Sequence, residues 1–340
     1  MHESKQQSEQ TPQMSKSTPR RLKWIDIAKG IAIILVVIGH TVAPGSPLVP
    51  MIFMFHMPLF FIMSGYTFRP KPMKSVVTIS AKRLLVPYLL IFLIWQGITW
   101  LQQPNALSLE SIKDLLLRLI FASGSPNADM GITAVGMAWF LMCLFVSRVF
   151  LNGLIILFSK RSIGWIAQAL VFAILASAGI AIGDVFNIFL PFDLDLALVT
   201  VGFMWCGYAA RELSLVEKWG ANPAVLLIAA VAYILAFNFS YLELAMRLFG
   251  IAPLCILGAL GGSLIACKAS MIIENHAKLL AMFLEFMGRN SMLVYCFHCM
   301  DWFVPWQSLP ALANLPLQHA IASALRTAYA ILMTILVKRV

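Results

Sequence analysis

Long apolar segments recur along the whole chain and restrict its fold more than any other feature. A helix that crosses the hydrocarbon core of a bilayer needs about 20 mostly apolar residues. By that rule the sequence predicts an all-α polytopic membrane protein with about ten transmembrane helices. We expect them over 25–43, 51–68, 84–101, 134–158, 163–183, 190–210, 222–239, 249–267, 290–306 and 319–337.

Charged side chains are too few to cover a water-soluble surface. They make up 12% of the 340 residues, against about 25% in an average soluble domain, while 60% of the residues are apolar. This composition excludes a soluble enzyme, a disordered chain and a disulfide-rich secreted domain.

The basic residues are distributed unevenly between the predicted loops. With a cytoplasmic N-terminus, 19 of the 25 Lys and Arg residues fall on the cytoplasmic side and three on the other side, while Lys29, Arg148 and Arg326 lie inside spans. The positive-inside rule therefore favours ten helices with both termini in the cytoplasm. The same topology, with contact to anionic membrane lipids, accounts for the net charge of +10 without a nucleic-acid partner.

Outside the spans the sequence predicts little additional structure. Residues 1–23 are polar and predict a disordered cytoplasmic tail, followed by a single membrane domain over 24–340. In the long connection 102–133, the stretch 108–121 has apolar residues at helical spacing and acidic residues near its start. This pattern predicts an amphipathic helix that lies in the membrane interface.

The six cysteines all lie in or beside apolar spans. Cys296, His298 and Cys299 are close enough in sequence to suggest metal ligands. Two thiols and one imidazole within four residues of a helix cannot close a tetrahedral site alone. We therefore expect packed thiols and no metal.

Ionisable side chains inside an apolar span are costly, so they are functional candidates. In the first span Lys29 and His40 are eleven residues apart, which places them on one helical face, about 16 Å apart along the axis. Asp26 precedes Lys29 by three residues and is expected to pair with it. The plainer alternatives are a lysine that extends to the headgroups beside its acidic partner, and a hydrogen-bonded core histidine.

A second histidine is expected at a similar depth. The second span returns through a hairpin rich in Pro and Gly and carries His56. His40 and His56 lie about four and six residues from that hairpin, so a shared polar site is favoured over two unrelated histidines. Imidazole titrates near neutrality, which suits general acid–base chemistry. Pro58 and Gly65 are expected to loosen the second helix near this site.

A basic residue, ten intervening positions and a histidine in a first membrane helix resemble the membrane acyltransferase-3 family, in its branch of sugar O-acetylases. Segments 55–66 and 82–88 resemble the family's second helix and the basic segment that leads into its third. This chain has Lys29 where many members have arginine, which keeps the charge but loses the bidentate fork. Further residues lie in segments that resemble blocks of the family's sequence pattern, in the second helix and later in the chain. They are Ser64, Trp139, Arg289, Asn290, Ser291, Tyr295 and His298.

The roles of these block residues stay open from the sequence. Ser291, Tyr295 and His298 are spaced i, i+4 and i+7, so they share one helical face. Trp139 suits packing better than stacking on a ligand. His298 also belongs to the cysteine-rich turn for which we expect no metal.

The resemblance implies an O-acyltransferase of the bacterial cytoplasmic membrane. Members of the family transfer an acyl group, usually acetyl, from a cytoplasmic donor to a carbohydrate at or beyond the membrane. In this chain it implies that His40 is the catalytic base, with His56 and Asp26 as further catalytic candidates. A covalent acyl-histidine is a less favoured variant of direct transfer.

The resemblance also implies a binding site for the donor. Acetyl-CoA or another acyl-CoA carries phosphates, and the segment 69–83 offers five basic side chains to them. Lys82 and Arg83 are favoured as donor contacts, together with Lys29 at the mouth of the first helix. The acyl-CoA is then a co-substrate, and no bound cofactor is expected. The acceptor sugar, the acyl chain and the oligomeric state stay open.

A different class of function stays open as well. Ten helices with buried polar groups also suit an exporter or carrier of an envelope polysaccharide or its lipid-linked precursor. The enzyme is favoured because the polar stripe places an imidazole behind a basic entrance. Paired helices broken by Gly or Pro in corresponding halves, which are typical of many transporters, are not evident.

Overall fold

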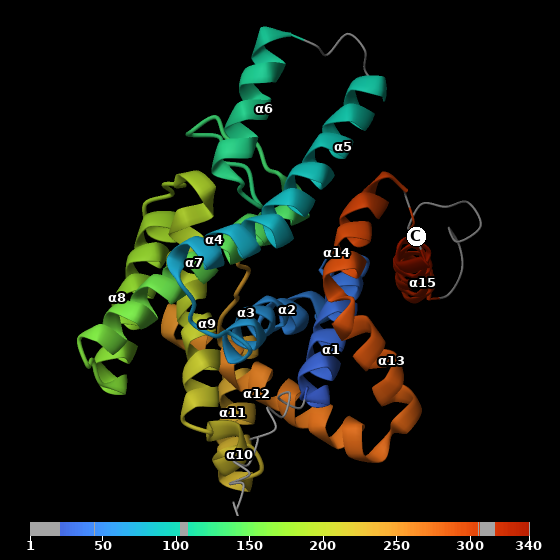
Figure 1. Cartoon of the computed structure of the whole chain (residues 1–340). Coiled ribbons are helices and arrows are strands. Elements are labelled where there is room, and N and C mark those ends of the chain that lie inside the picture. Colours follow the sequence, from blue (N-terminus) through green and yellow to red (C-terminus); the bar gives the residue numbers. More distant parts are fainter. Residues whose placement is uncertain (1–20, 44, 103–107, 305, 307–316, 340) are drawn as a thin grey trace, which may run out of the picture.

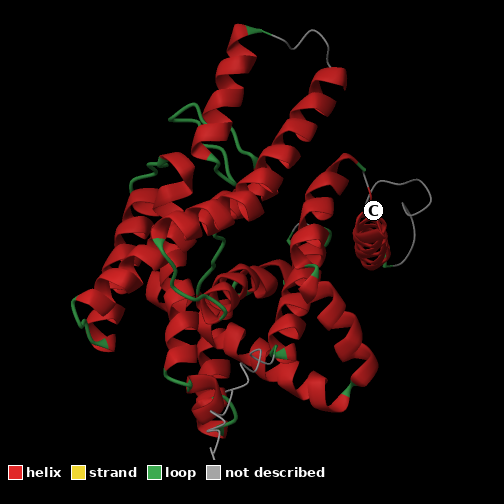
Figure 2. Cartoon of the chain, in the orientation of Figure 1, coloured by secondary structure: helices red, strands yellow, loops and turns green. Residues whose placement is uncertain are grey.

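A computed structural model shows a helical bundle (Figure 1). It describes residues 21–43, 45–102, 108–304, 306 and 317–339, so most of the predicted tail over 1–23 lies outside the described residues. Within this part of the chain all regular structure is helical, apart from two isolated β-bridges, Asn127–Ile132 and Glu243–Leu248 (Figure 2). The all-α prediction is confirmed.

Most α-helices follow one another closely, with longer connections between Phe121 and Gly136 and between Phe239 and Ala252, and several continue into a π or 3-10 turn. Their order is α1 (Lys23–Gly39), α2 (Leu48–Phe53), α3 (His56–Tyr66), α4 (Met73–Ser80), η1 (Ala81–Leu85), α5 (Val86–Gln102), α6 (Leu109–Phe121), η3 (Gly136–Ala138), α7 (Trp139–Lys160), α8 (Trp165–Ile180), η4 (Ala181–Val185), η5 (Pro191–Asp193), α9 (Leu194–Glu212), α10 (Leu215–Trp219), α11 (Pro223–Phe239), α12 (Ala252–His276), α13 (Lys278–Arg289), α14 (Ser291–Met300), η6 (Asp301–Phe303) and α15 (Gln318–Arg339).

Seven helical segments in the described part of the chain are long and apolar enough to cross a membrane. α11 and α14 are apolar but shorter, and the 17 residues of α1 include three charged side chains near its start. An integral membrane protein is therefore supported. The count of ten spans and the orientation of the termini stay predictions. The seven segments are Leu48–Tyr66, Met73–Gln102, Gly136–Lys160, Trp165–Val185, Pro191–Glu212, Ala252–His276 and Gln318–Arg339.

The second predicted span is interrupted directly before its histidine. α2 ends at Phe53 and α3 begins at His56, and Phe55 between them has the non-helical angles φ −137° and ψ −19°. We expected Pro58 to loosen this helix. Instead Pro58 lies in the first turn of α3, where the missing N–H of a proline costs no helical hydrogen bond.

Two amphipathic helices lie between or beside the apolar ones. α6 confirms the helix expected over 108–121, and Ser108 caps it through reciprocal hydrogen bonds with Ser111. α13, by contrast, is not detected by a search for long apolar runs, because it has only 12 residues and one of its faces is polar. It packs along the whole first half of α1 and so helps to position the Lys29 end of that helix.

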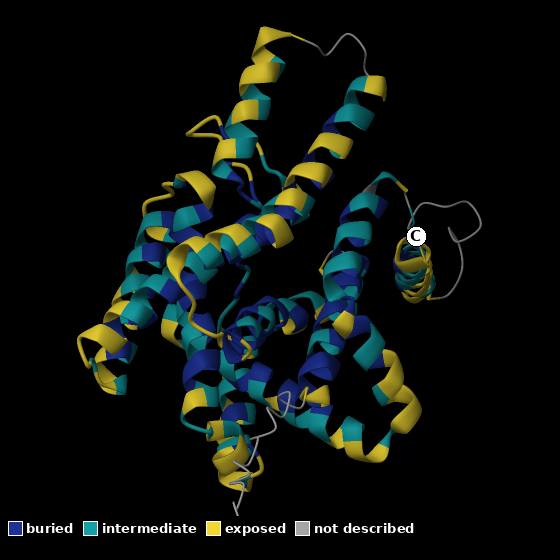
Figure 3. Ribbon diagram, viewed as in Figure 1, coloured by how far each residue is buried: buried dark blue, intermediate teal, exposed yellow. Residues whose placement is uncertain are grey.

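α1 lies inside the bundle, against α3, α12, α13, α14 and α15 (Figure 1). Figure 3 shows that most of α1 and α3 is buried, whereas the outer faces of α8 and α13 are exposed. Small residues let the backbones approach closely. Gly30 of α1 faces the backbone of Leu284, and Gly288 of α13 faces the backbone of Asp26. Close contacts of this kind are typical of helices that pack within a membrane.

The contact between α3 and α9 depends on Gly207. A Cβ atom at this position would overlap the carbonyl oxygen of Ile62. Gly207→Val should therefore separate the two helices and cost about 1–3 kcal/mol of stability, the usual range for overpacking. Gly202→Ala is a control on the same helix, because the Phe172 carbonyl oxygen lies 3.9 Å from a Cβ built there. Thermal unfolding in detergent measures the difference, and equal melting temperatures for the two variants would contradict this packing.

Candidate active site

Lys29 and His40, the predicted motif of α1, each line a cavity. Lys29 lines a cavity of about 470 Å³, named here the basic cavity. In the described residues its wall contains no carboxylate. The cations that line it are Lys29, Arg69, Lys71, Arg83 and Arg148. Arg69 lies 3.9 Å from Glu212, which is outside this wall, and the excess of positive charge on the other four cations favours an anionic ligand.

Arg148 of α7 brings a guanidinium into the apolar part of the bundle. Its Nη1 donates to the hydroxyl of Ser64 at 3.0 Å and its Nε to the hydroxyl of Ser80 at 3.3 Å. The guanidinium carbon lies 5.4 Å from the centre of the Phe68 ring. These neutral groups orient the side chain without neutralising it, so its charge is directed at the basic cavity. Ser64, a predicted block residue, lines the basic cavity itself and also orients Arg148.

His40 follows the last turn of α1 at the other end of the row. It lines a cavity of about 350 Å³ whose wall includes Trp95 of α5 and Trp139 of α7, named here the aromatic cavity. It also lines a narrow cavity of about 40 Å³ together with His56. Trp139 is 5% exposed and faces both, so it packs, as expected, and also forms part of the site.

The two histidines lie near each other and line the same narrow cavity, while their common depth in a membrane stays a prediction. Phe53 separates them, with its ring centre 5.7 Å from that of His40 and 5.0 Å from that of His56. The His56 ring is almost fully buried, and its Nδ1 donates to the carbonyl of Ile52 at 2.8 Å. In the neutral ring, Nε2 is then an acceptor. The break between α2 and α3 positions this imidazole.

α14 runs beside α1 and connects the cavities. Ser291 and Tyr295 line the basic cavity, and Tyr295 also lines the narrow one. The His298 ring lies with its centre 5.7 Å from that of His40. The predicted shared face of Ser291, Tyr295 and His298 is therefore confirmed. The Tyr295 hydroxyl donates to the carbonyl of Met137, which places its ring between the two ends of the row.

A buried ionic cluster holds the imidazole of His298. Its Nδ1 lies 3.3 Å from Asp301, while its Nε2 is buried without a partner in the described structure. Arg326 of α15 donates to both carboxylate oxygens of Asp301, at 2.6 and 3.1 Å. The same guanidinium donates to the carbonyl of His40 and the hydroxyl of Thr41, each at 3.0 Å. One arginine thus connects the end of α1 to His298.

Asp26 and Lys82 do not reach these cavities. The expected ion pair between Asp26 and Lys29 does not form. Asp26 instead accepts two hydrogen bonds from Arg21, at 2.6 and 3.0 Å. Lys82 is exposed and, unlike Arg83, does not line the basic cavity.

Arg289 and Asn290 shape the junction between α13 and α14. Arg289 lies 3.5 Å from Glu285 on the same helix, and its side chain is largely exposed. The Asn290 amide donates to the carbonyl of Phe286 at 2.7 Å. Neither residue lines the cavities described above. They orient α14, which carries the three residues of the site face.

Sequence reasoning overlooked Arg148, Asp301 and Arg326 as site residues. The criterion that singled out Lys29 and His40, an ionisable side chain inside an apolar span, applies to these three residues as well. Glu243, which lines the aromatic and narrow cavities, lies in a connection between spans and carries no such signal.

Comparison with known proteins identifies the family. The sequence pattern of the acyltransferase domain of the acyltransferase-3 family matches residues 22–337, nearly the whole chain. The chain therefore belongs to this family of membrane acyltransferases, as its motifs predict. Nodulation protein NolL of Mesorhizobium japonicum is 31% identical to it over 160 residues, which is 44% of this chain and 39% of that protein. The match thus spans well under half the length of this relative.

Proposed function

We propose that the protein transfers an acyl group, acetyl in the simplest case, from an acyl-CoA to a hydroxyl of a cell-envelope or exported carbohydrate, with His40 as the catalytic base. Family membership supports acyl transfer. The observation that carries the proposal is the row of cavities along α1. The cationic cavity at Lys29 shares Tyr295 with the narrow cavity, and the narrow cavity shares His40 and Trp139 with the aromatic cavity.

The two ends of the row suit the two ends of the donor. Lys29 and His40 lie about 16 Å apart along α1, at 1.5 Å per residue. The phosphates of an acyl-CoA would meet the cations of the basic cavity, while its extended arm carries the thioester past Tyr295 toward His40. The basic cavity would then open on the cytoplasmic side of the bacterial cytoplasmic membrane, in line with the positive-inside rule.

Direct transfer needs one base beside the thioester. The acceptor hydroxyl attacks the carbonyl carbon, a C–O bond forms, the C–S bond breaks, and the hydroxyl proton passes through His40 to the departing thiolate. His298, which Asp301 orients, and His56 are the neighbouring imidazoles that support this transfer. Asp26 acts at a distance, by fixing the start of α1 through Arg21.

Variants of Arg83 and Lys82 distinguish donor binding in the basic cavity from a general effect of surface charge. Arg83→Ala should raise the KM for acetyl-CoA about tenfold, the scale of one charge-assisted hydrogen bond, because Arg83 lines the basic cavity. Lys82→Ala is the matched control and should leave that KM close to wild type, because Lys82 lies outside the cavity. Initial rates with purified protein measure both constants. Equal increases in the two variants would show that surface charge, and not the cavity, attracts the donor.

Deletion of the gene in its source organism tests the function as a whole. Mass spectrometry of the envelope carbohydrates should show the loss of O-linked acyl esters, with a normal amount of polymer outside the cell. Polymer that accumulates inside the cell with its esters intact would instead support the exporter.

A further inference from the structure

We propose that the aromatic cavity binds an uncharged sugar unit of the acceptor, and that Gln96 and Glu243 hydrogen-bond its hydroxyls. This inference rests on the proposed function and adds the class of sugar that the site accepts. The cavity of about 350 Å³ is at the small end of known ligand pockets, which suits one or two sugar rings. His40 lines the same cavity, so a bound hydroxyl lies beside the proposed base.

Two indole rings form the apolar part of the cavity. Trp95 donates through Nε1 to the carbonyl of Cys299 at 3.0 Å, which fixes its ring against α14. Trp139 begins α7 and is almost fully buried. A sugar ring has an apolar face of C–H groups and an edge of hydroxyls. Rigid aromatic walls with a few placed polar groups match both features.

Gln96 is a polar side chain that packing does not explain. It lies on α5 among apolar neighbours, is only 8% exposed and lines the aromatic cavity. No residue in the described ranges hydrogen-bonds its side-chain amide, and the amide atoms are not fully buried, so they stay accessible to a ligand in the cavity. An amide offers two donors and one acceptor, which the hydroxyls of a sugar can satisfy.

Glu243 enters the cavity from a tight hairpin. Reciprocal backbone hydrogen bonds of 2.9 and 3.1 Å between Glu243 and Leu248 close this hairpin. The side chain lines both the aromatic and the narrow cavity. The Tyr241 hydroxyl donates to Oε2, while no described residue donates to Oε1. One carboxylate oxygen near His40 is therefore free to accept from a ligand hydroxyl.

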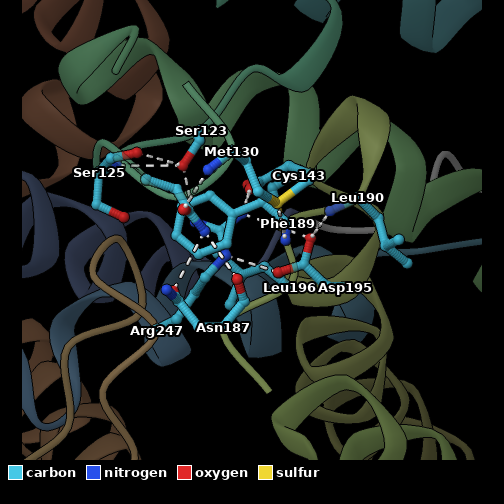
Figure 4. A network of polar contacts seen from close by, with 12 residues as sticks. Ser123, Ser125, Met130, Cys143, Asn187, Phe189, Leu190, Asp195, Leu196 and Arg247 are labelled. Atoms are coloured by element: carbon cyan, nitrogen blue, oxygen red, sulfur yellow. Dashed lines mark hydrogen bonds and ion pairs between the residues drawn. The ribbon is translucent and has the colours of Figure 1, made fainter. Parts of the chain in front are cut away.

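Arg247 anchors that hairpin. Although its loop position suggests an exposed charge, it is 2% exposed. Its guanidinium donates to Asp195 at 2.6 Å and to the Ser123 hydroxyl at 2.9 Å (Figure 4). It also donates to Asp193 at 2.5 Å. Ser123 begins the loop that forms another wall of the aromatic cavity. One buried side chain thus joins two walls of the cavity to the start of α9, and Glu243 is presented from a firmly fixed element.

The charges around the cavity select against acidic sugars. Arg118 is the cation of the described wall, and Asp114 on the same helix pairs with it. Glu243 is left as an unneutralised carboxylate. A uronic acid would add a second negative charge close to it, whereas a neutral sugar offers only hydroxyls.

Oligosaccharides from the organism's own envelope polysaccharide test the inference. They are deacylated with alkali, separated into neutral and acidic fractions, and incubated with purified protein and radiolabelled acetyl-CoA. We expect label in the neutral fraction. Label confined to the acidic fraction would overturn the inference and leave the proposed function intact. Absence of label from both fractions would contradict the proposed function itself.

Variants then test the two side chains. Glu243→Gln and Gln96→Ala should each raise the KM for the neutral acceptor about tenfold, with the KM for acetyl-CoA unchanged, because only acceptor contacts are lost. Glu110→Gln, at an exposed carboxylate of α6, is the matched control and should behave like wild type. An unchanged acceptor KM in both cavity variants, or equal increases in both KM values, would refute the assignment.

Discussion

Asp301→Ala is expected to lose acyl transfer and most of its folded yield. The carboxylate is 1% exposed, pairs with Arg326 and orients His298. Its removal leaves the guanidinium of Arg326, itself 4% exposed, as a buried charge without its partner. Breaking a buried ion pair in this way costs about 3–5 kcal/mol. Thermal unfolding and the amount of monodisperse protein recovered in detergent measure the loss.

A double variant distinguishes the effect of the Asp301–Arg326 pair on folding from its effect on the position of His298. Asp301→Leu combined with Arg326→Met removes both charges at similar volume, so most of the lost stability should return. His298 would still lack its partner, and the hydrogen bonds from Arg326 to the end of α1 would be lost, although His319 of α15 still donates to the carbonyl of Thr41. We therefore expect transfer to stay about tenfold or more below wild type. A double variant with wild-type activity would show that the cluster supports the fold alone.

His40→Ala should have the second large effect. Loss of a general base typically lowers the rate about 10²–10⁴-fold. Folding should be preserved, because Arg326 donates to the backbone carbonyl of His40, which the variant keeps. His276→Ala, at an exposed histidine that ends α12, is the matched control. A full rate in His40→Ala at wild-type stability would contradict the catalytic role, and equal losses in both variants would indicate a non-specific effect.

The fold class and the line from Lys29 to His40 could be predicted, because a membrane-spanning helix needs a long apolar run and keeps a regular spacing of side chains. Apolar runs of sufficient length predicted most of the long helices, and the eleven-residue spacing placed Lys29 and His40 on one face. The hairpin length predicted that His56 lies near His40. Periodicity predicted the face of α14 that carries Ser291, Tyr295 and His298. Each of these arguments uses local geometry, which a helix preserves.

The rest of the site depends on contacts between segments far apart in the sequence. Arg326 and Asp301 meet through the packing of α15 on α14, and Arg247 is buried because two distant segments, at Ser123 and at Asp195, converge on it. Asp26 has two basic neighbours, and only the packing decides that Arg21 is its partner. α13 was not predicted as a helix that packs on α1, because it is short and its polar face interrupts the apolar run that marks a span.

Acyl transfer by the purified protein tests the central claim most directly. Wild type and His40→Ala, at equal amounts of folded protein, are incubated with radiolabelled acetyl-CoA and the deacylated envelope carbohydrate, and alkali-labile label on the carbohydrate is counted. We predict steady labelling by the wild type and only background labelling by His40→Ala. Equal labelling by the two proteins, or no labelling by folded wild-type protein, would contradict the account.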